Sequence, residues 1–440
     1  MAGARTTAAT PTAPEGTAPL VAETFDELDP PRRLLMGPGP VTADPRVLRA
    51  LAMPLLGQFD PAFTRYMNEV MVLLRQLYQT QNRWAFLVDG TARAGIEAIL
   101  VSLIVPGDRV LVPIFGRFGH LLAEIARRCG AELITIETEW GTVFPPERVI
   151  AAIEKTRPKL VALVHGDTST TMAQPMDGIG AACRRHDAYL YVDATATLGG
   201  MEVAVDGWEA DAISAGLQKC LSGPPGSSPI TFNERVAALV NGRKHVEQGI
   251  APPGFVPGNG PAIRSNYFDL AMLMDYWGPD RLNHHTEATS MLYAARECAR
   301  IVLKEGLDAC FARHRLVSEA LVAGFDAMGL AIYGDVRHKM ANVTGVVIPD
   351  GIDGDAVRAA LLRDFDLEIG TSFGPLRGRI WRIGTMGYNA TERNVVFCLN
   401  ALEQVLRGQG FRAPAGAGTA AAEARFRAAG VSPPAPPRAS

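Results

Sequence analysis

The stretch "DAISAGLQKCLSGPPGSSPI" (211–230) indicates the fold class of this chain. Its first part, 211–215, is apolar and short, as is typical of a buried strand, and it is followed by Gln218, Lys219 and Cys220. The Gly-Pro-Pro-Gly run at 223–226 then predicts an irregular loop. A lysine is therefore expected where a strand ends, at the rim of a sheet.

Other short apolar runs precede this one, with amphipathic helical patterns between them. They are "AFLV" (85–88), "RVLVP" (109–113), "ELITIET" (132–138), "KLVALVH" (159–165) and "AYLYVD" (188–193). Strands that are apolar throughout and separated by helices predict a mainly parallel sheet covered on both faces, in an α/β fold. Ligands of such sheets bind beyond the carboxyl ends of the strands.

The pattern changes after about residue 286, where a long helix, a second helix and shorter strands near 343–348 and 379–383 are expected. We therefore predict a large domain over 26–285, with an N-terminal arm over 26–56, and a smaller α+β domain over 286–411. The ends, 1–25 and 412–440, are rich in Ala and Pro and are predicted to be tails. In the second tail, "GTAAAEARFRAAG" favours a short helix.

Composition excludes several classes of partner. The chain has 440 residues, of which 48% are hydrophobic and 20% are charged. Its net charge is -3, so it lacks the excess of basic residues with which proteins bind nucleic acid or an anionic membrane. The apolar run at 98–105 is too short to span a bilayer, and the N-terminus lacks the pattern of a secretory signal. We expect a cytoplasmic protein. The six cysteines form no CxxC pair and do not cluster with histidines, so no metal site is predicted.

Polar groups follow five of the expected strands, in "DGTAR" (89–93), "FGRFGH" (115–120), "HGDTST" (165–170), "VDATAT" (192–197) and "GLQKC" (216–220). Each has an ordinary structural explanation. "DGTAR" can be a plain turn, Asp193 a helix cap, Phe118 and His165 core residues, and Lys219 a surface lysine. Together they match pyridoxal 5'-phosphate (PLP), which needs a lysine, a carboxylate, a stacking ring and a phosphate cup at a helix N-terminus.

The chain resembles the class V, fold-type I aminotransferases, within the alanine- and serine-glyoxylate group, over 34–408. The matching segments are "LMGPGPV" (35–41), "DGTARAGIEA" (89–98), "VHGDTST" (164–170), "VDATATLGG" (192–200), "GLQKCLSGPPG" (216–226), "NHHTEA" (283–288) and "RIWRIGTMG" (379–387). The resemblance implies a large domain with a mainly parallel seven-stranded sheet, a smaller C-terminal α+β domain, and a homodimer with shared active sites.

The resemblance also implies roles for single residues. Lys219 would bind the cofactor and carry protons, Asp193 would pair with the pyridine nitrogen, and Phe118 would stack on the ring. Thr168 would approach the ring hydroxyl, and Arg382 would bind the substrate carboxylate. The phosphate would be held by Thr91, Ala92, Arg93 and Gln218, with Thr286 of the other subunit.

A narrower resemblance, to the branch of this family that uses (S)-ureidoglycine, lies in "GQFDPAF" (57–63), "NRWAF" (82–86), "GRFGHL" (116–121), "EWGTVF" (139–144), "SNYFDL" (265–270) and "SSPITFNERVA" (227–237). It implies glyoxylate as the acceptor, in purine catabolism. Gln58 and Asn266 are the candidates for binding the carbamoyl group, because a carboxamide both donates and accepts hydrogen bonds. Alternatively, Gln58 ends a loop and Asn266 caps a helix near Tyr267. Asn283 stands where alanine-glyoxylate relatives have a tyrosine.

Three rival functions remain open at this point. An alanine- or serine-glyoxylate aminotransferase would run the same reaction with another donor. A cysteine desulfurase would need a mobile nucleophilic cysteine, and Cys220, Cys310 and Cys398 are poor candidates because of their positions. A cofactor-binding regulator would need a basic DNA-binding module, which the N-terminal segment does not resemble.

Overall fold

The structure is a computed structural model that describes residues 25–279 and 281–430. The tail predicted over 1–25 lies outside the described residues except for Phe25, and so does the end of the second tail, 431–440. Residues 25–32 are a separate unit and form neither helix nor strand, whereas the described residues from 33 onward belong to one compact unit.

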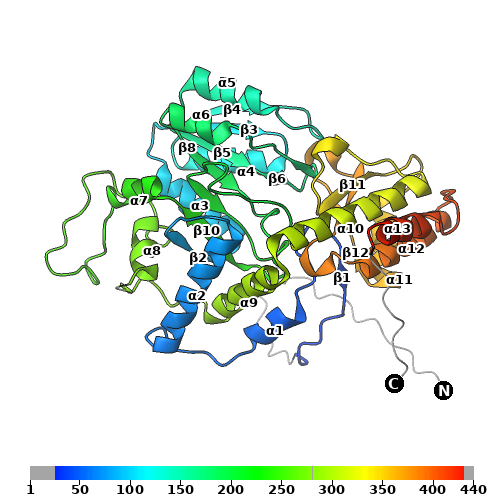
Figure 1. Ribbon diagram of the computed structural model, residues 1–440, viewed down its shortest axis with the longest axis horizontal. Helices are drawn as coiled ribbons and strands as arrows, with labels where there is room; N and C mark the ends of the chain where they lie inside the picture. The colour runs from blue at the N-terminus through cyan, green and yellow to red at the C-terminus, as the bar shows by residue number, and fades with distance from the viewer. Residues whose placement is uncertain (1–24, 280, 431–440) are drawn as a thin grey trace, which may run out of the picture. The chain divides into compact units, whose positions relative to one another are not determined.

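The larger sheet of that unit has seven strands in the order β2-β10-β9-β8-β5-β3-β4 (Figure 1). Its strands are β2 (Trp84–Gly90), β3 (Arg109–Ile114), β4 (Glu132–Glu137), β5 (Leu160–Val164), β8 (Tyr189–Asp193), β9 (Ala212–Ser214) and β10 (Gly226–Phe232). Strand β10 is antiparallel to both of its neighbours, β2 and β9, and all other pairs in this sheet are parallel. The other six strands therefore run in one direction. The predicted mainly parallel, seven-stranded sheet is confirmed, and the carboxyl ends of the other six strands share one rim.

Strand β10 was not among the apolar runs that the sequence pattern identified. It contains Pro229, which has no N–H to donate and is usually confined to edge strands or bulges. Here the carbonyl of Pro229 accepts hydrogen bonds from the backbone N–H of Ala215, at 2.8 Å, and from the hydroxyl of Tyr78, at 2.8 Å. The carbonyl of Ala215, which would face the missing N–H, accepts from the hydroxyl of Ser228 at 2.7 Å. The strand can therefore hold a proline, because no backbone acceptor opposite it is left unpaired.

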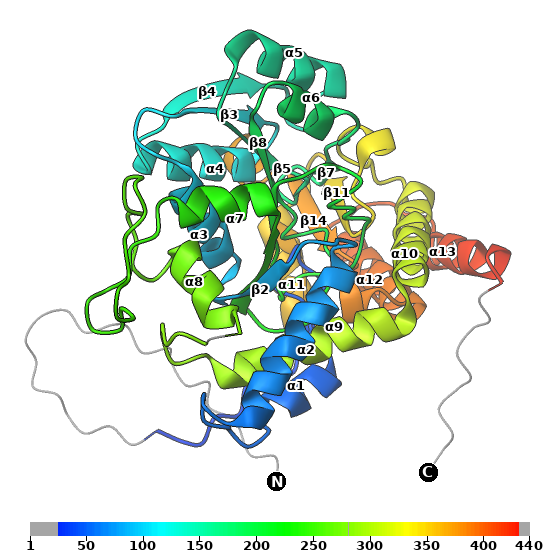
Figure 2. The same ribbon diagram turned by 60° about the vertical axis from the view of Figure 1, so that its left-hand side comes forward.

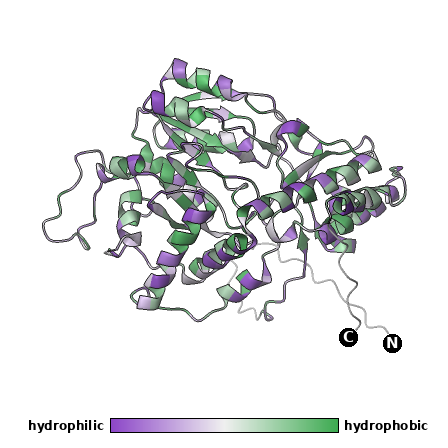
Figure 3. Cartoon of the chain, in the orientation of Figure 1, coloured by the Kyte–Doolittle hydropathy of each residue, from purple (hydrophilic) through white to green (hydrophobic). Residues whose placement is uncertain are grey.

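Helices surround the larger sheet, some packed on its strands and others packed on those helices (Figures 1 and 2). They are α1 (Pro45–Leu51), α2 (Pro61–Leu77), α3 (Ala92–Leu103), α4 (Arg117–Arg128), α5 (Pro146–Thr156), α6 (Ile179–Arg185), α7 (Glu234–Asn241), α8 (Leu270–Trp277) and α9 (Thr289–Glu305). Helix α2 lies against β2, β10 and α9, while α3 lies against β2, β9 and β10 and also contacts α4, α7 and α8. Most of the strand residues are buried, which explains their uniformly apolar sequences (Figure 3).

The C-terminal part builds a second core around a three-stranded sheet of order β11-β14-β13. Its elements are α10 (Leu307–Met328), β11 (Val343–Val347), α11 (Gly354–Phe365), β13 (Gly370–Thr371), β14 (Ile380–Gly384), α12 (Glu392–Gly408) and α13 (Ala417–Ala428). The Ala-rich segment thus forms helix α13, which packs on α10 and α12. Gly324 of α10 and Gly418 of α13 face each other so closely that a side chain on Gly324 would meet the Gly418 carbonyl at 3.0 Å.

Smaller elements complete the described chain. They are β1 (Leu34–Leu35) paired with β12 (Leu367–Glu368), the hairpin of β6 (Gly166–Asp167) and β7 (Met172–Ala173), and three 3-10 turns, η1 (Val336–His338), η2 (Gly374–Leu376) and η3 (Gly387–Asn389). The pairing of β1 with β12 ties the start of the compact unit to the C-terminal core. Among the described helices, none combines the length and the apolar character needed to cross a membrane.

Candidate active site

Lys219 lies in the turn that follows β9, at the rim of the larger sheet. Its side chain is partly buried, and the amine donates a hydrogen bond to the carbonyl of Pro38, in the "LMGPGPV" segment. Burial, with the positive charge of Arg382, lowers the pKa of Lys219 to about 8, although Cys220 and Asp193 oppose this shift. A lysine of this kind is a better nucleophile and base near neutral pH than a solvent-exposed one.

Gly39 explains why the "LMGPGPV" segment can cover Lys219. Its backbone φ is +103°, a conformation that glycine adopts without strain, and an added Cβ would collide with the lysine side chain. Any other residue here would push the backbone away from the amine.

Asp193 ends the neighbouring strand β8 and is also buried. One of its oxygens, Oδ1, accepts a hydrogen bond from the backbone N–H of Thr195 at 2.9 Å. No ion pair joins Asp193 to any residue between 25 and 430 that the structure describes. Burial raises the pKa of this carboxyl, so a cationic ligand in the cavity would relieve an unfavourable arrangement.

A cavity of about 240 Å³ opens between these two groups. Its lining includes most of the predicted cofactor contacts, namely Thr91, Ala92, Arg93, Phe118, Thr168, Asp193, Gln218 and Lys219, together with Arg117 and Thr195. The sheet rim therefore brings together residues that lie in five different loops of the sequence. Thr286 is the one predicted cofactor contact that does not line it.

One end of this cavity is the start of helix α3. Thr91 is the N-cap of α3, but its side chain accepts no hydrogen bond from the helix, so the first backbone N–H groups lack a side-chain cap. Gly90, with φ of +118°, makes the turn that leads into the helix. This geometry is a ready anion site, as predicted from "DGTAR".

Phe118 is positioned by a residue that the sequence analysis did not single out. The buried carboxylate of Asp167 accepts hydrogen bonds from the backbone N–H of Phe118, at 2.8 Å, and from the hydroxyl of Ser169, at 2.6 Å. Gly116 makes room for this contact, because a Cβ there would strike the Asp167 carboxylate. Asp167 thereby anchors the loop that carries the ring.

Arg382 lies behind Thr168, on strand β14 of the smaller sheet. Its guanidinium donates to the carbonyls of Thr168, at 2.8 Å, and Thr371, at 2.6 Å. Burial lowers the pKa of Arg382 to about 10, which leaves it charged at neutral pH. Arg382 and Arg117 both lie over the ring of Phe373, at 4.9 and 4.4 Å, so two cations frame one side of the site.

This electrostatic arrangement predicts how the cofactor-free protein takes up PLP. The neutral amine of Lys219 is the reactive form, so the uptake rate should rise with pH and reach half its maximum near pH 8. In Arg382→Gln the loss of a nearby positive charge raises the lysine pKa, and the midpoint should move to higher pH. Stopped-flow absorbance of PLP measures both profiles. Arg377→Gln, at an exposed position, is the control, and an unmoved midpoint in Arg382→Gln would contradict the assignment.

The three remaining predicted contacts gather elsewhere in the chain. The side-chain amide of Gln58 donates to Oδ1 of Asn283 at 2.9 Å, and the backbone carbonyl of Asn266 contacts Nε2 of His284 at 3.1 Å. Thr286, which is exposed, lies in the same segment. None of these residues lines the cavity beside Lys219. They form one polar group, 58, 266 and 283–286, on a different part of the chain.

The alternative role considered for Asn266, a helix cap, is wrong. Helix α8 begins at Leu270, and its N-cap is Asp269, whose carboxylate accepts from the backbone N–H of Ala271 at 2.8 Å. The Asn266 side chain is exposed and donates weakly to Glu247 at 3.4 Å. The carboxamide partner of Gln58 is therefore Asn283, which sequence reasoning had noted only as a replaced tyrosine.

His165 behaves as a core residue, as its ordinary explanation held. Its Nδ1 contacts the hydroxyl of Thr197 at 2.9 Å, its ring packs edge-on against Trp208, and burial lowers its pKa to about 4. Cys220 is buried as well, and the amide of Asn342 contacts its sulfur at 2.9 Å. Burial raises the pKa of this thiol to about 11, which makes it a poor nucleophile.

These residues fit PLP. Gln218 Oε1 and Thr195 Oγ1 are buried beside the cavity without a hydrogen-bond partner among the described residues, and so have capacity for a ligand. The helix start can hold a phosphate, Asp193 faces the cavity without a cation, and Lys219 supplies the amine. The roles of Asp167 and Asn283 were not predicted. Each side chain acts by a hydrogen bond to a loop far away in the sequence, and such a contact leaves no local pattern.

Comparison with known proteins agrees with this geometry. The family model for class-V aminotransferases matches residues 55–374. The (S)-ureidoglycine--glyoxylate transaminase of Bacillus subtilis is 58% identical over 86% of this chain and 92% of its own length. A crystal structure of ureidoglycine-glyoxylate aminotransferase from the same species has a TM-score of 0.87, with 55% identity over 91% of this chain and 100% of that chain.

An alanine--glyoxylate aminotransferase of Drosophila melanogaster is more distant, at 34% identity over 86% of this chain and 93% of its own length. Both the family model and these relatives extend over most of the compact unit, and the Lys219 cavity falls inside the matched region. The chain belongs to the class-V aminotransferase family.

Proposed function

We propose that this chain transfers the amino group of (S)-ureidoglycine to glyoxylate, giving oxalurate and glycine, in purine catabolism. The observation that carries the choice of donor is the carboxamide pair of Gln58 and Asn283. Asn283 accepts from the amide nitrogen of Gln58 at 2.9 Å, while Gln58 Oε1 is buried without a hydrogen-bond partner among the described residues. The bond to Asn283 fixes the orientation of the Gln58 amide, and its oxygen is left free to accept a hydrogen bond. A carbamoyl N–H of the donor could supply that hydrogen bond.

As a class-V aminotransferase, the chain uses PLP, which supplies the electron sink for the substrate Cα when it is bound. Lys219 binds the cofactor and moves the proton to and from Cα. Asp193 holds a proton on the pyridine nitrogen, which matches a carboxylate that lacks a cation. Phe118 packs on the ring, and Arg382 binds the substrate carboxylate. Thr91, Ala92, Arg93 and Gln218 bind the phosphate.

We further propose that the active site is shared across a homodimer. Gln58 is hydrogen-bonded to Asn283 and Asn266 to His284, Thr286 follows in the same segment, and none of the three predicted contacts lines the cavity of its own chain. We infer that a second copy of the chain brings this group to Lys219. Large apolar side chains beside Gln58 support this arrangement, because Leu55 is 69% and Phe59 is 81% exposed. Exposed apolar surface of this kind is typical of an interface. The dimer would work in the cytoplasm.

Alanine- and serine-glyoxylate transfer remain the alternatives that an experiment must separate. A small donor such as alanine has nothing to pair with Gln58 Oε1, and an unpaired buried acceptor penalises that donor. Desulfurase chemistry is disfavoured, because Cys220, Cys310 and Cys398 are buried and burial raises their thiol pKa values to about 11, 12 and 12.

The test is donor preference. In single-turnover absorbance of the PLP-loaded protein, freshly generated (S)-ureidoglycine should react much faster than L-alanine or L-serine. Gln58→Ala should lower kcat/KM for ureidoglycine by about 10- to 100-fold and leave the alanine reaction nearly unchanged, since one buried hydrogen bond is lost. Asn283→Ala should have a similar effect by releasing Gln58.

The matched control is Gln404→Ala, which removes an exposed carboxamide far along the chain on α12. If Gln58→Ala lowers kcat/KM equally for all donors, Gln58 has a structural role and the enzyme is a general glyoxylate aminotransferase.

Mixed dimers of Gln58→Ala and Lys219→Ala chains test the shared site. They should regain up to about one active site per dimer if Gln58 serves the partner's lysine, and none if it serves its own.

A further inference from the structure

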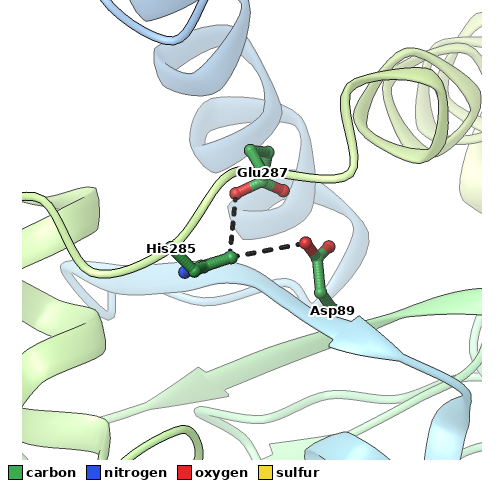
Figure 4. Close-up of side chains that lie close together, drawn as sticks. All are labelled: Asp89, His285 and Glu287. Atoms are coloured by element: carbon green, nitrogen blue, oxygen red, sulfur yellow. Dashed lines mark ion pairs between the residues drawn. The ribbon is translucent and has the colours of Figure 1, made fainter.

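Asp89, His285 and Glu287 lie close together (Figure 4), with Glu287 buried and the other two partly buried. None of them lines the Lys219 cavity. Asp89 lies near the end of β2, just before the phosphate-binding turn, and the other two precede helix α9. Nε2 of His285 is 3.4 Å from Asp89 Oδ2 and 3.7 Å from Glu287 Oε2. Composition and cysteine spacing had predicted no metal site, but this cluster contains no cysteine.

The cluster carries buried polar atoms that nothing described satisfies. The side chain of Glu287 is 1% exposed, and neither of its oxygens accepts a hydrogen bond from a described residue. Asp89 Oδ1 and His285 Nε2 are also unpaired, while Asp89 Oδ2 accepts from the N–H of Ala288 at 2.8 Å. Two carboxylates in such a place need a cation or a proton.

The hydrogen bonds around His285 indicate which of its nitrogens can bind a ligand. Nε2 of His284 lies 3.1 Å from the carbonyl of Asn266, which only accepts, so this nitrogen carries the hydrogen. A neutral imidazole that carries its hydrogen on Nε2 has an acceptor at Nδ1. Nδ1 of His285, at 2.8 Å, donates to that acceptor in this arrangement. With its hydrogen on Nδ1, His285 directs the lone pair of Nε2 toward two carboxylates.

The separations favour a metal ion over a direct contact. A charge-assisted hydrogen bond would bring the atoms to about 2.7–2.9 Å. Ligands of a tetrahedral ion with bonds of about 2.0–2.1 Å stand about 3.3–3.4 Å apart. Nε2 of His285 is 3.4 and 3.7 Å from the two carboxylates, and the three ligand atoms all lie within 4.8 Å of one another. We propose that Asp89, His285 Nε2 and Glu287 bind a divalent transition-metal ion of the Zn²⁺ type, with water as the fourth ligand. Imidazole among the ligands disfavours Mg²⁺ and Ca²⁺.

Such an ion would have a structural role. It would join the segment 285–287 to the end of β2, only two residues before Thr91 and the phosphate-binding turn. His284 would act as the outer partner that fixes the orientation of the His285 ring. The proposal does not depend on the amino donor.

The experiment uses the full chain after chelator treatment and dialysis. Isothermal titration with Zn²⁺, followed by elemental analysis, should give one tightly bound ion per chain. His285→Asn and Glu287→Gln should weaken this binding by at least about 10- to 100-fold. Zn²⁺ should raise the midpoint of thermal unfolding of the parent chain but not of either variant. His120→Asn, at an exposed histidine, is the matched control and should bind as the parent does.

Two outcomes would overturn the proposal. They are the absence of stoichiometric metal in the folded parent chain and retention of the metal by both variants. If the parent binds none and Glu287→Gln is more stable than the parent, the site is assigned to a proton or to a cationic side chain of another subunit. If one variant fails to fold, Asp89→Asn replaces it. No amino donor is present, so a negative result leaves the proposed transamination untouched.

Discussion

Lys219→Ala should abolish transamination, lowering kcat/KM by at least about 10⁴-fold with every amino donor. The substitution removes both the group that binds the cofactor covalently and the base that moves the Cα proton, and each of these contributions is large. The side chain lies against Pro38 and faces the cavity, so no neighbouring amine is available to replace it among the residues that line the cavity. Product formation by chromatography and the visible absorption of bound PLP are the measurements.

Lys304→Ala provides the comparison, because that lysine is exposed on α9 and touches no part of the cavity. It should keep full activity. Added methylamine should restore a measurable fraction of the rate in Lys219→Ala if the missing function is that of a base. A Lys219→Ala chain within tenfold of the parent rate would refute the assignment.

Asp193→Asn should lower kcat/KM by about 10²- to 10⁴-fold, because an amide cannot hold the proton on the pyridine nitrogen. The same change should stabilise the cofactor-free protein by about 1–2 kcal/mol at pH 8, since it removes a buried carboxylate that has no ion pair among the described residues. Activity assays and denaturant unfolding of the cofactor-free chains measure the two effects.

The pH dependence of that stabilisation follows from the direction of the pKa shift. Burial raises the pKa of Asp193 in the folded chain, so the parent loses stability as pH rises through that pKa, and the asparagine variant does not. The difference between them should be large at pH 8 and shrink towards pH 4. Thr195→Ala, which keeps the carboxylate, should show no such stabilisation. A cofactor-free Asp193→Asn chain that is less stable at pH 8 would contradict this account.

The sheet was predictable because most of its strands are buried on both faces and therefore apolar over short lengths. Strand β10 escaped that pattern for a physical reason. Its sequence, "GSSPITF", contains serines and a proline, and whether such residues can be buried depends on partners elsewhere in the fold. The Ser228 hydroxyl, for example, donates to the carbonyl of Ala215 at 2.7 Å. Such partners cannot be seen in a single segment.

The same limit applied to the site. Residues at the ends of parallel strands were predictable, since topology alone brings Asp193 and Lys219 to one rim. Asp167 and Asn283 were not, because each acts by a hydrogen bond to a loop that is far away in sequence. The cluster of Asp89, His285 and Glu287 joins segments 199 residues apart, as the bond from Ala288 to Asp89 shows. Motif spacing cannot detect a ligand set of that kind.

The position of β10 also bears on how the chain is made. Strand β2 is an edge strand whose only partner in the sheet is β10, so residues 84–90 have no sheet neighbour until residues 226–232 exist. A nascent chain that ends before β10 can pair β3, β4, β5, β8 and β9 but leaves β2 without a partner in the sheet. Closing that long loop is slow compared with local contacts. The turn at the end of β2 should therefore reach its final position late in biosynthesis.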